Sequence, residues 1–175
     1  MISEKSLTKQ ILSWAFVIVW MVIIFMFSSQ DSTNSFNTSK DFTEEIVSLF
    51  DNQTTHINTK TFTIKHHNTV RKFAHFAIYI VLGILVQNAI SLSSIKWKFT
   101  ASLILCVAYS ITDEIHQIFV PGRACKWYDI AIDSVGSVVG IGLYMLVIYL
   151  IFVKKSKNNQ ITTKTDTWYL YRFFI

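Results

Sequence analysis

Two stretches of the chain contain no charged residue over about the length of a membrane span. Residues 11–27 (ILSWAFVIVWMVIIFMF) are uncharged over 17 positions, and residues 134–153 (SVGSVVGIGLYMLVIYLIFV) are uncharged over 20. A helix rises about 1.5 Å per residue, so about 20 residues cross the roughly 30 Å hydrocarbon core of a bilayer. Each stretch therefore predicts a transmembrane helix.

Two further apolar blocks, residues 73–90 and 99–112, gather their polar residues toward one end. We interpret the first as a helix of about 18 residues and the second as a helix that continues to Val120. The fourth helix is expected to begin at Asp129, ahead of its uncharged stretch. The sequence thus predicts an all-α integral membrane bundle over residues 11–153, with four transmembrane helices at about 11–27, 73–90, 99–120 and 129–153.

The composition agrees with a membrane protein. Hydrophobic residues make up 51% of the chain and charged residues 15%, whereas soluble domains average about 25% charged. Two Cys in 175 residues argue against a disulfide scaffold or a structural zinc cluster. The first block follows Lys5 and Lys9, as a signal peptide would, but it is long for one and no A-x-A-like cleavage site follows it. We expect a retained first helix.

The charges sort onto the two sides of the membrane once four crossings are assumed. Both termini then share a side with Lys96 and Lys98, and this side holds nine cations and two acids. The opposite side holds seven cations and nine acids. Because Lys and Arg near helix ends concentrate in cytoplasmic loops, residues 1–10 and the tail 154–175 should be cytoplasmic, and the long loop 28–70 external.

The formal net charge of +5 is therefore explained by topology, and no nucleic-acid partner is expected. Contact with anionic membrane lipids is a secondary effect of the same charges. The external loop is rich in Asn, Thr and Ser. Within it, apolar residues share one face over residues 41–50, which predicts a short amphipathic helix that could lie on the membrane surface.

Polar residues that interrupt the apolar pattern fall at the outer ends of the predicted helices. In the second helix, Arg71, His75 and Tyr79 recur every fourth residue and so share one face, with Lys72 beside them. The remaining members of this set are Gln30 at the end of the first helix, Tyr109, Asp113, Glu114, His116 and Gln117 in the third, Asp129 and Asp133 in the fourth, and Arg123 in the connection before it.

An ionisable side chain inside the membrane costs about 2.5–3.5 kcal/mol on insertion scales, so such residues normally face the bundle interior and pair. The acids of the third and fourth helices can pair with the cations at positions 71, 72 and 123. The simplest arrangement is a polar cleft that opens outward.

Several of these residues also have a purely structural interpretation. Lys72 and Lys126 could extend to lipid headgroups. Tyr79 and Tyr109 could belong to the interfacial aromatic belt. The pattern of Gly136 and Gly140 is more typical of close helix packing than of chemistry.

Four segments together resemble the VanZ-like family of small membrane proteins, which is named for a teicoplanin-resistance factor. They are FSSQ (27–30), RKFAHF (71–76) followed by Tyr79 and Gly83, DEIHQIFVPGR (113–123), and the run Asp129, Asp133, Gly136 and Gly140. The resemblance spans about residues 27–142 in the same order and spacing. Many relatives carry an acidic residue before the tyrosine of the second motif, where this chain has Ile78.

The resemblance implies a multi-pass protein of the bacterial cell membrane, associated in some members with reduced susceptibility to teicoplanin-type glycopeptides. The target of these antibiotics is the externally exposed cell-wall precursor. We therefore hypothesise that Arg71, Lys72 and Arg123 neutralise a pyrophosphate or carboxylate of a lipid-linked cell-wall precursor or glycopeptide. The candidate ligand-binding residues are Gln30, Arg71, Lys72, Tyr79, Glu114, Gln117, Arg123, Asp129 and Asp133.

An alternative hypothesis is a membrane-embedded hydrolase or transferase with His75, His116 and Asp113 as catalytic candidates. An imidazole titrates near pH 6.5 and can act as a general base while a carboxylate fixes its tautomer. A metal held by both histidines and a carboxylate would suit this chemistry, but no H-E-x-x-H, G-x-S-x-G or lipid-phosphatase pattern is present, so no metal or other cofactor is expected. A proton relay ranks last because the inner halves of the helices carry no ionisable residue.

Overall fold

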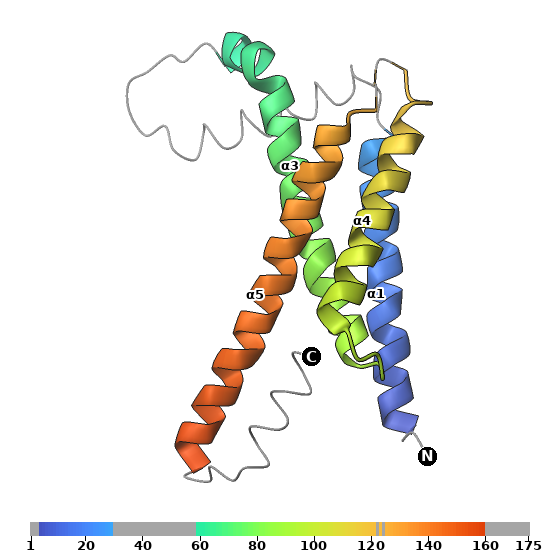
Figure 1. Ribbon diagram of the computed structural model, residues 1–175. Helices are drawn as coiled ribbons and strands as arrows, with labels where there is room; N and C mark the ends of the chain where they lie inside the picture. The colour runs from blue at the N-terminus through green and yellow to red at the C-terminus, as the bar shows by residue number, and fades with distance from the viewer. Residues whose placement is uncertain (1–3, 30–58, 122, 124, 160–175) are drawn as a thin grey trace.

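The computed structural model describes residues 4–29, 59–121, 123 and 125–159, and these residues form a helical bundle (Figure 1). The helices are α1 (Glu4–Ser28), α3 (Thr59–Ser91), α4 (Lys98–Gln117) and α5 (Trp127–Asn159). The described residues contain no strand. The predicted all-α fold is confirmed for this part of the chain.

Three of the helices are long and apolar enough to cross a membrane. The candidate spans are Leu7–Ser28 in α1, Arg71–Ser91 in α3 and Trp127–Lys154 in α5. The predicted third span, α4, is not among them, although 20 residues would be long enough. Its apolar character is reduced by polar residues that are buried against the other helices: Ser102, Ser110, Asp113, Glu114 and Gln117.

The predicted helix bounds need correction at several ends. The prediction that residues 28–70 form a loop is wrong from Thr59 onward, because α3 begins there. That this segment is external stays a prediction. No Gly or Pro interrupts residues 59–71, so the helix continues beyond its apolar part. For the same reason α5 continues to Asn159, into the predicted tail, and α1 begins at Glu4. Helix α4 ends at Gln117 rather than Val120, and the next residues form turns. The helix predicted over 41–50 lies outside the described residues.

Helices α3 and α5 form the most extensive packing contact, and three glycines allow it. A Cβ atom at Gly136 would lie 2.7 Å from the carbonyl oxygen of Phe76 on α3. At Gly140 and Gly83 a Cβ would overlap backbone atoms of Ile80 and Ser137, respectively, on the facing helix. The interpretation of Gly136 and Gly140 as packing residues is therefore confirmed.

Helix α1 is fastened to the bundle by two aromatic side chains that bond to backbone carbonyls of a neighbouring helix. The indole N–H of Trp20 donates to the carbonyl of Ile78 on α3 at 2.9 Å. The hydroxyl of Tyr109 on α4 donates to the carbonyl of Met21 on α1 at 2.5 Å. Tyr79 is fully buried, so this tyrosine and Tyr109 belong to the bundle interior rather than to an interfacial belt.

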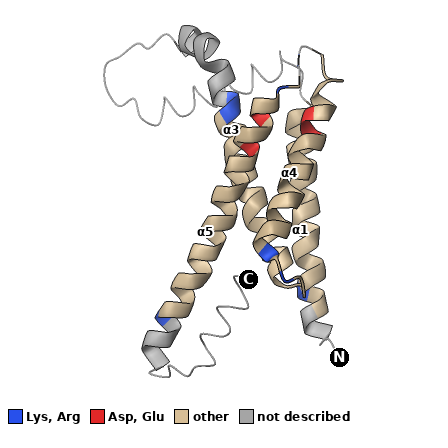
Figure 2. Ribbon diagram, in the orientation of Figure 1, with Lys and Arg blue, Asp and Glu red and all other residues tan. Residues whose placement is uncertain are grey.

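Apolar and charged side chains divide the outer surface as a bilayer requires. Large apolar side chains along α1 and α5, among them Phe16, Val22, Leu146 and Ile151, are exposed. Contact of these side chains with lipid tails carries no hydrophobic free-energy cost, whereas their exposure to water would be unfavourable. Charged residues lie near the two ends of the bundle (Figure 2). Among the side chains that the structure describes, all acids lie at the end where α4 finishes and α5 begins, and Lys9, Lys96, Lys98 and Lys154 lie toward the other. The assignment of the lysine end to the cytoplasm stays a prediction.

Candidate functional site

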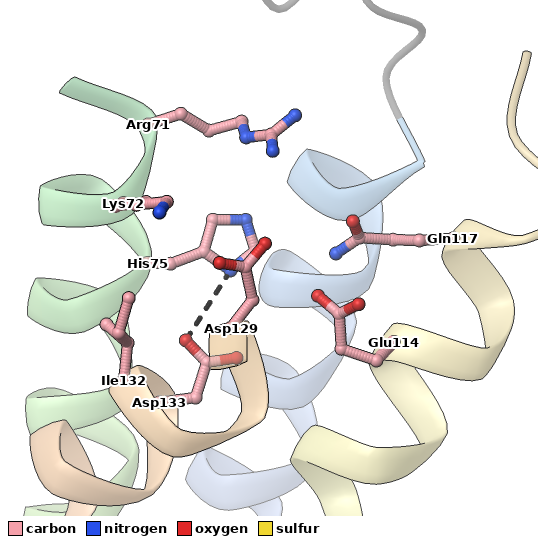
Figure 3. A pocket seen from close by; sticks show the side chains of 8 residues that line it. All are labelled: Arg71, Lys72, His75, Glu114, Gln117, Asp129, Ile132 and Asp133. Carbon is pink, nitrogen blue, oxygen red and sulfur yellow. Dashed lines mark ion pairs between the residues drawn. The ribbon is translucent and has the colours of Figure 1, made fainter. Parts of the chain in front are cut away.

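A polar pocket opens at the acidic end of the bundle, between α3, α4 and α5. Figure 3 shows the side chains that line it: Arg71, Lys72 and His75 from α3, Glu114 and Gln117 from α4, and Asp129, Ile132 and Asp133 from α5. Seven of these eight residues are polar or charged. The structure thus brings together residues that are up to 62 positions apart in the sequence, from Arg71 to Asp133.

Helical spacing explains how α3 and α5 present these groups. His75 follows Arg71 by one turn, and Asp133 follows Asp129 by one turn, so each pair projects from one face. Asp129 lies in the first turn of α5, where the positive end of the helix dipole stabilises a carboxylate. The motif residues therefore converge because two regular helices cross at this level.

Two residues of the pocket lining, His75 and Asp133, belong to a cluster of one imidazole and two carboxylates. Nδ1 of His75 lies 3.8 Å from Oδ1 of Asp133. The other oxygen of this carboxylate, Oδ2, accepts a hydrogen bond from the hydroxyl of Ser110 at 3.2 Å. Asp113 completes the group, because one potential ligand atom from each of His75, Asp113 and Asp133 lies within 4.8 Å of the other two. We call these three residues the His-Asp-Asp cluster.

Glu114 supports the pocket wall. Its side chain is buried, and Oε2 accepts a hydrogen bond from the backbone N–H of Lys126 at 2.9 Å. This bond ties the end of α4 to the residue that precedes α5. Glu114 therefore fixes the connection between two helices that both contribute to the pocket.

The cations lie around the upper part of the pocket. The guanidinium of Arg71 extends across the pocket above His75 in Figure 3. The ammonium of Lys72 lies 4.3 Å from the ring centre of Tyr128, a cation–π geometry that holds it at the rim. Arg123 is half-buried, and its charge acts on His75 together with that of Arg71. Lys126 is 5.9 Å from the same Tyr128 ring.

The structure does not bring the two candidate catalytic histidines together. The ring of His116 lies 4.2 Å from that of Phe25 on α1, and its Nε2 lies 3.0 Å from the hydroxyl of Ser29. His116 therefore faces α1, whereas His75 faces α5. A metal held jointly by these histidines does not fit this arrangement.

The other predicted site residues differ in where they lie. Gln117 lines the pocket and donates from Nε2 to the hydroxyl of Ser28 at 3.0 Å. Tyr79 lies in the core, with its ring 6.3 Å from that of Tyr109. Gln30 lies outside the described residues. Sequence reasoning did not single out Ser110, although its position three residues before Asp113 places both on the same helix face.

Apolar helices that enclose buried ionisable groups at one end define a helical membrane protein with a polar site. Residues 13–153 match the model of the VanZ/LLP1 family, so the chain belongs to that family. The resemblance seen in its motifs is thereby confirmed, and the chain is a VanZ-like protein, linked through its family to glycopeptide resistance. Neither a curated protein nor a solved structure matches the chain.

Proposed function

We propose that this chain binds an anionic cell-envelope ligand in the polar pocket and thereby lowers susceptibility to teicoplanin-type glycopeptides. The ligand would be a lipid-linked cell-wall precursor or the glycopeptide itself. The observation that carries the proposal is the placement of Arg71 and Lys72 at an open pocket whose inner wall is acidic. The Tyr128 ring holds the Lys72 ammonium at the rim, and both cations are available to an anion from outside.

The level of the pocket in the membrane favours a lipid-linked anion. Phe119 and Trp127, which lie in the connection and at the start of α5 beside the pocket, are 78% and 79% exposed. Exposed aromatic residues at a helix end are typical of the interface between lipid tails and headgroups. A pyrophosphate attached to a lipid would lie at this same level. Arg71 can bind its oxygens in a bidentate manner, and Lys72 can add a point charge.

The proposal includes a bacterial plasma-membrane location with four spans and both termini in the cytoplasm. Helix α4 packs against α1, α3 and α5, so its buried polar residues are turned inward. Its large exposed residues, such as Ile104 and Ile111, are apolar, and the exposed hydroxyl of Thr112 donates to the carbonyl of Tyr109. A helix of 20 residues shielded in this way can cross the bilayer as part of a bundle. The pocket then opens to the cell exterior.

Antibiotic susceptibility tests the proposal in cells. A teicoplanin-susceptible Gram-positive host that expresses the wild-type chain should tolerate more teicoplanin than the same host without it. Arg71→Gln removes the guanidinium that binds the anion, and we expect it to return susceptibility to that of cells without the protein. Lys154→Gln, at the opposite end of the bundle, should keep the wild-type phenotype.

Immunoblots of the membrane fraction establish equal amounts of each variant. Equal tolerance in Arg71→Gln and wild-type cells would contradict a role for the pocket. A glycopeptide that binds directly would be captured by the purified protein without any precursor, whereas precursor binding would require the lipid.

The contact of His75 with Asp133 favours a second candidate function, a hydrolase acting on a lipid phosphoester. Nδ1 of His75 lies 3.8 Å from Oδ1 of Asp133, and shortening of this distance to a hydrogen bond would orient the imidazole as a general base. Purified protein incubated with a polyprenyl diphosphate would then release inorganic phosphate, and His75→Gln would abolish release. Release that is equal with and without the protein would eliminate this candidate and leave binding.

A further inference from the structure

We propose that His75, Asp113 and Asp133 bind one divalent transition-metal ion, such as Zn²⁺ or Mn²⁺, beside the polar pocket that His75 and Asp133 line. The ion would connect α3, α4 and α5, since each helix supplies one ligand. This proposal differs from the pairing of His75 with His116, because a second carboxylate takes the place of the second imidazole.

The geometry of the His-Asp-Asp cluster is close to that of a bound ion. Around tetrahedral zinc, with bonds of about 2.0–2.2 Å, ligand atoms are separated by about 3.4 Å. The distance from Nδ1 of His75 to Oδ1 of Asp133 is 3.8 Å, and the ligand atoms of all three residues lie within 4.8 Å of one another. Small side-chain rotations would close the remaining difference. Three ligands from three helices also leave positions open for a further ligand, as metal sites that bind substrates do.

Three of the four carboxylate oxygens in the cluster are buried without a hydrogen-bond partner; the fourth, Oδ2 of Asp133, accepts from Ser110. Asp113 is 2% exposed, and neither of its oxygens has a hydrogen-bond partner. Asp133 is 0% exposed, and its Oδ1, the atom that faces His75, also has none. Gln117 and Ser28, which lie beside Asp113, are bonded to each other. A buried carboxylate is costly unless it is paired or coordinates a metal, so these oxygens require a positive partner.

The donor set indicates which ions fit. Imidazole suits Zn²⁺ and other first-row transition metals, whereas carboxylates also accept Mn²⁺, Mg²⁺ and Ca²⁺. One imidazole with two carboxylates therefore favours Zn²⁺ or Mn²⁺ over ions that prefer oxygen ligands alone. The Ser110 hydroxyl, which donates to Oδ2 of Asp133, resembles the outer hydrogen bonds that orient metal ligands.

A metal ion would also complete the charge arrangement for an anion, and this step rests on the proposed function. The residues that line the pocket include two cations, Arg71 and Lys72, and three acids, Glu114, Asp129 and Asp133, so the lining carries one formal negative charge in excess. A divalent ion changes this excess to one positive charge. His75 and Asp133 line the pocket, so an anion that enters past Arg71 can reach the ion. Its oxygens would take the open coordination positions.

Metal content tests the proposal directly. The chain is purified in detergent with a tag that lacks histidine, stripped with EDTA, loaded with Zn²⁺ or Mn²⁺, desalted and measured by mass spectrometry of the metal. Wild type should hold about one ion per chain, with affinity weakened at least about 100-fold in Asp133→Asn. His116→Ala serves as the matched control, because it removes an imidazole at the same end without touching the cluster. It should retain the ion, whereas His75→Ala should lose it.

The melting temperature of the wild-type chain with and without metal tests the proposal even if a variant is poorly folded. Wild type stripped with EDTA should melt several degrees higher when Zn²⁺ or Mn²⁺ is restored, because the ion binds the folded chain. Asp133→Asn should show no such rise, and Mg²⁺ should not replace the transition metal. Loss of the ion in His116→Ala to the same extent as in His75→Ala, or a wild-type chain that holds no ion after loading, would overturn the proposal.

The proposed metal site and the proposed anion site can be refuted independently of each other. Arg71→Gln should keep its metal while losing the anion. A wild-type protein that binds metal but no polyprenyl diphosphate would refute the proposed function alone. One that binds the diphosphate in EDTA as tightly as with metal, and holds no metal, would refute the metal site alone.

Discussion

Gly140→Leu should prevent the α3–α5 pair from forming in its native geometry and give the largest loss of stability of any substitution considered for this chain. A Cβ at this position overlaps the backbone of Ile80, which no side-chain rotation can move. Insertion of extra volume into a packed interface typically costs about 1–3 kcal/mol, and a whole isobutyl group against backbone should exceed this range. Because the same helix pair positions His75 and Asp133, the pocket should be lost together with the packing.

Gly142→Leu is the matched control. It lies two residues along the same helix, where a Cβ would meet no atom within 4 Å, and it is exposed. Leucine has the higher helix propensity by about 0.8 kcal/mol and suits a lipid-facing surface. Thermal unfolding in detergent should therefore show a large decrease for Gly140→Leu and none for Gly142→Leu. Equal melting of the two variants would show that close approach of α3 and α5 does not hold the bundle together.

Cys125 should react with a membrane-impermeant maleimide that is added to intact cells, and this all-or-none result would establish which end of the bundle faces outward. The thiol is exposed in the connection between α4 and α5, next to the polar pocket. Desolvation and the nearby carboxylate of Glu114 raise the pKa of the Cys125 thiol, so labelling should be faster at pH 8.5 than at pH 7. The positive-inside rule predicts that this end is external.

The chain contains its own control for this experiment. Cys106, the other cysteine, is buried among the helices and should stay unlabelled until the protein is denatured. A Lys154→Cys variant places a thiol at the opposite end and should be labelled only after the cells are opened. Protection of Cys125 in intact cells, with labelling of position 154, would invert the topology and turn the pocket toward the cytoplasm.

The apolar pattern was sufficient to predict the helices, but not where they end. Residues 11–27 and 134–153 are uncharged because lipid surrounds them, and that requirement stops at the membrane surface. A helix can continue past that surface wherever no Gly or Pro interrupts it. This is why α3 begins at Thr59 and α5 reaches Asn159, beyond the bounds that hydrophobicity predicts.

The sequence was sufficient to predict which site residues share a helix face, but not which residues of the other helices they contact. Asp113 and His116 are about 60° apart around α4, close enough to be grouped from the sequence. In the structure Asp113 lies next to His75, whereas His116 packs on the ring of Phe25 in α1. Periodicity describes one helix at a time, so it cannot tell which helix will lie against each part of its surface.

The bond from the Lys126 N–H to Glu114 illustrates a second limit. It depends on the path of the connection between α4 and α5, and backbone hydrogen-bond partners in such a connection have no periodic pattern. Sequence reasoning grouped Glu114 with the ligand-binding residues from its neighbours Asp113 and His116. The structure adds a structural role that the pattern could not indicate.

The most direct test of the pocket as an anion site is the affinity of the purified chain for a polyprenyl diphosphate in nanodiscs of uncharged lipid, measured with and without Zn²⁺. Hydrogen bonds to charged groups contribute about 1.5–3 kcal/mol, so Arg71→Gln should bind at least about tenfold more weakly than wild type. Lys154→Gln should bind as wild type does. Equal affinities of wild type and Arg71→Gln, or no saturable binding by the wild-type chain, would contradict the account.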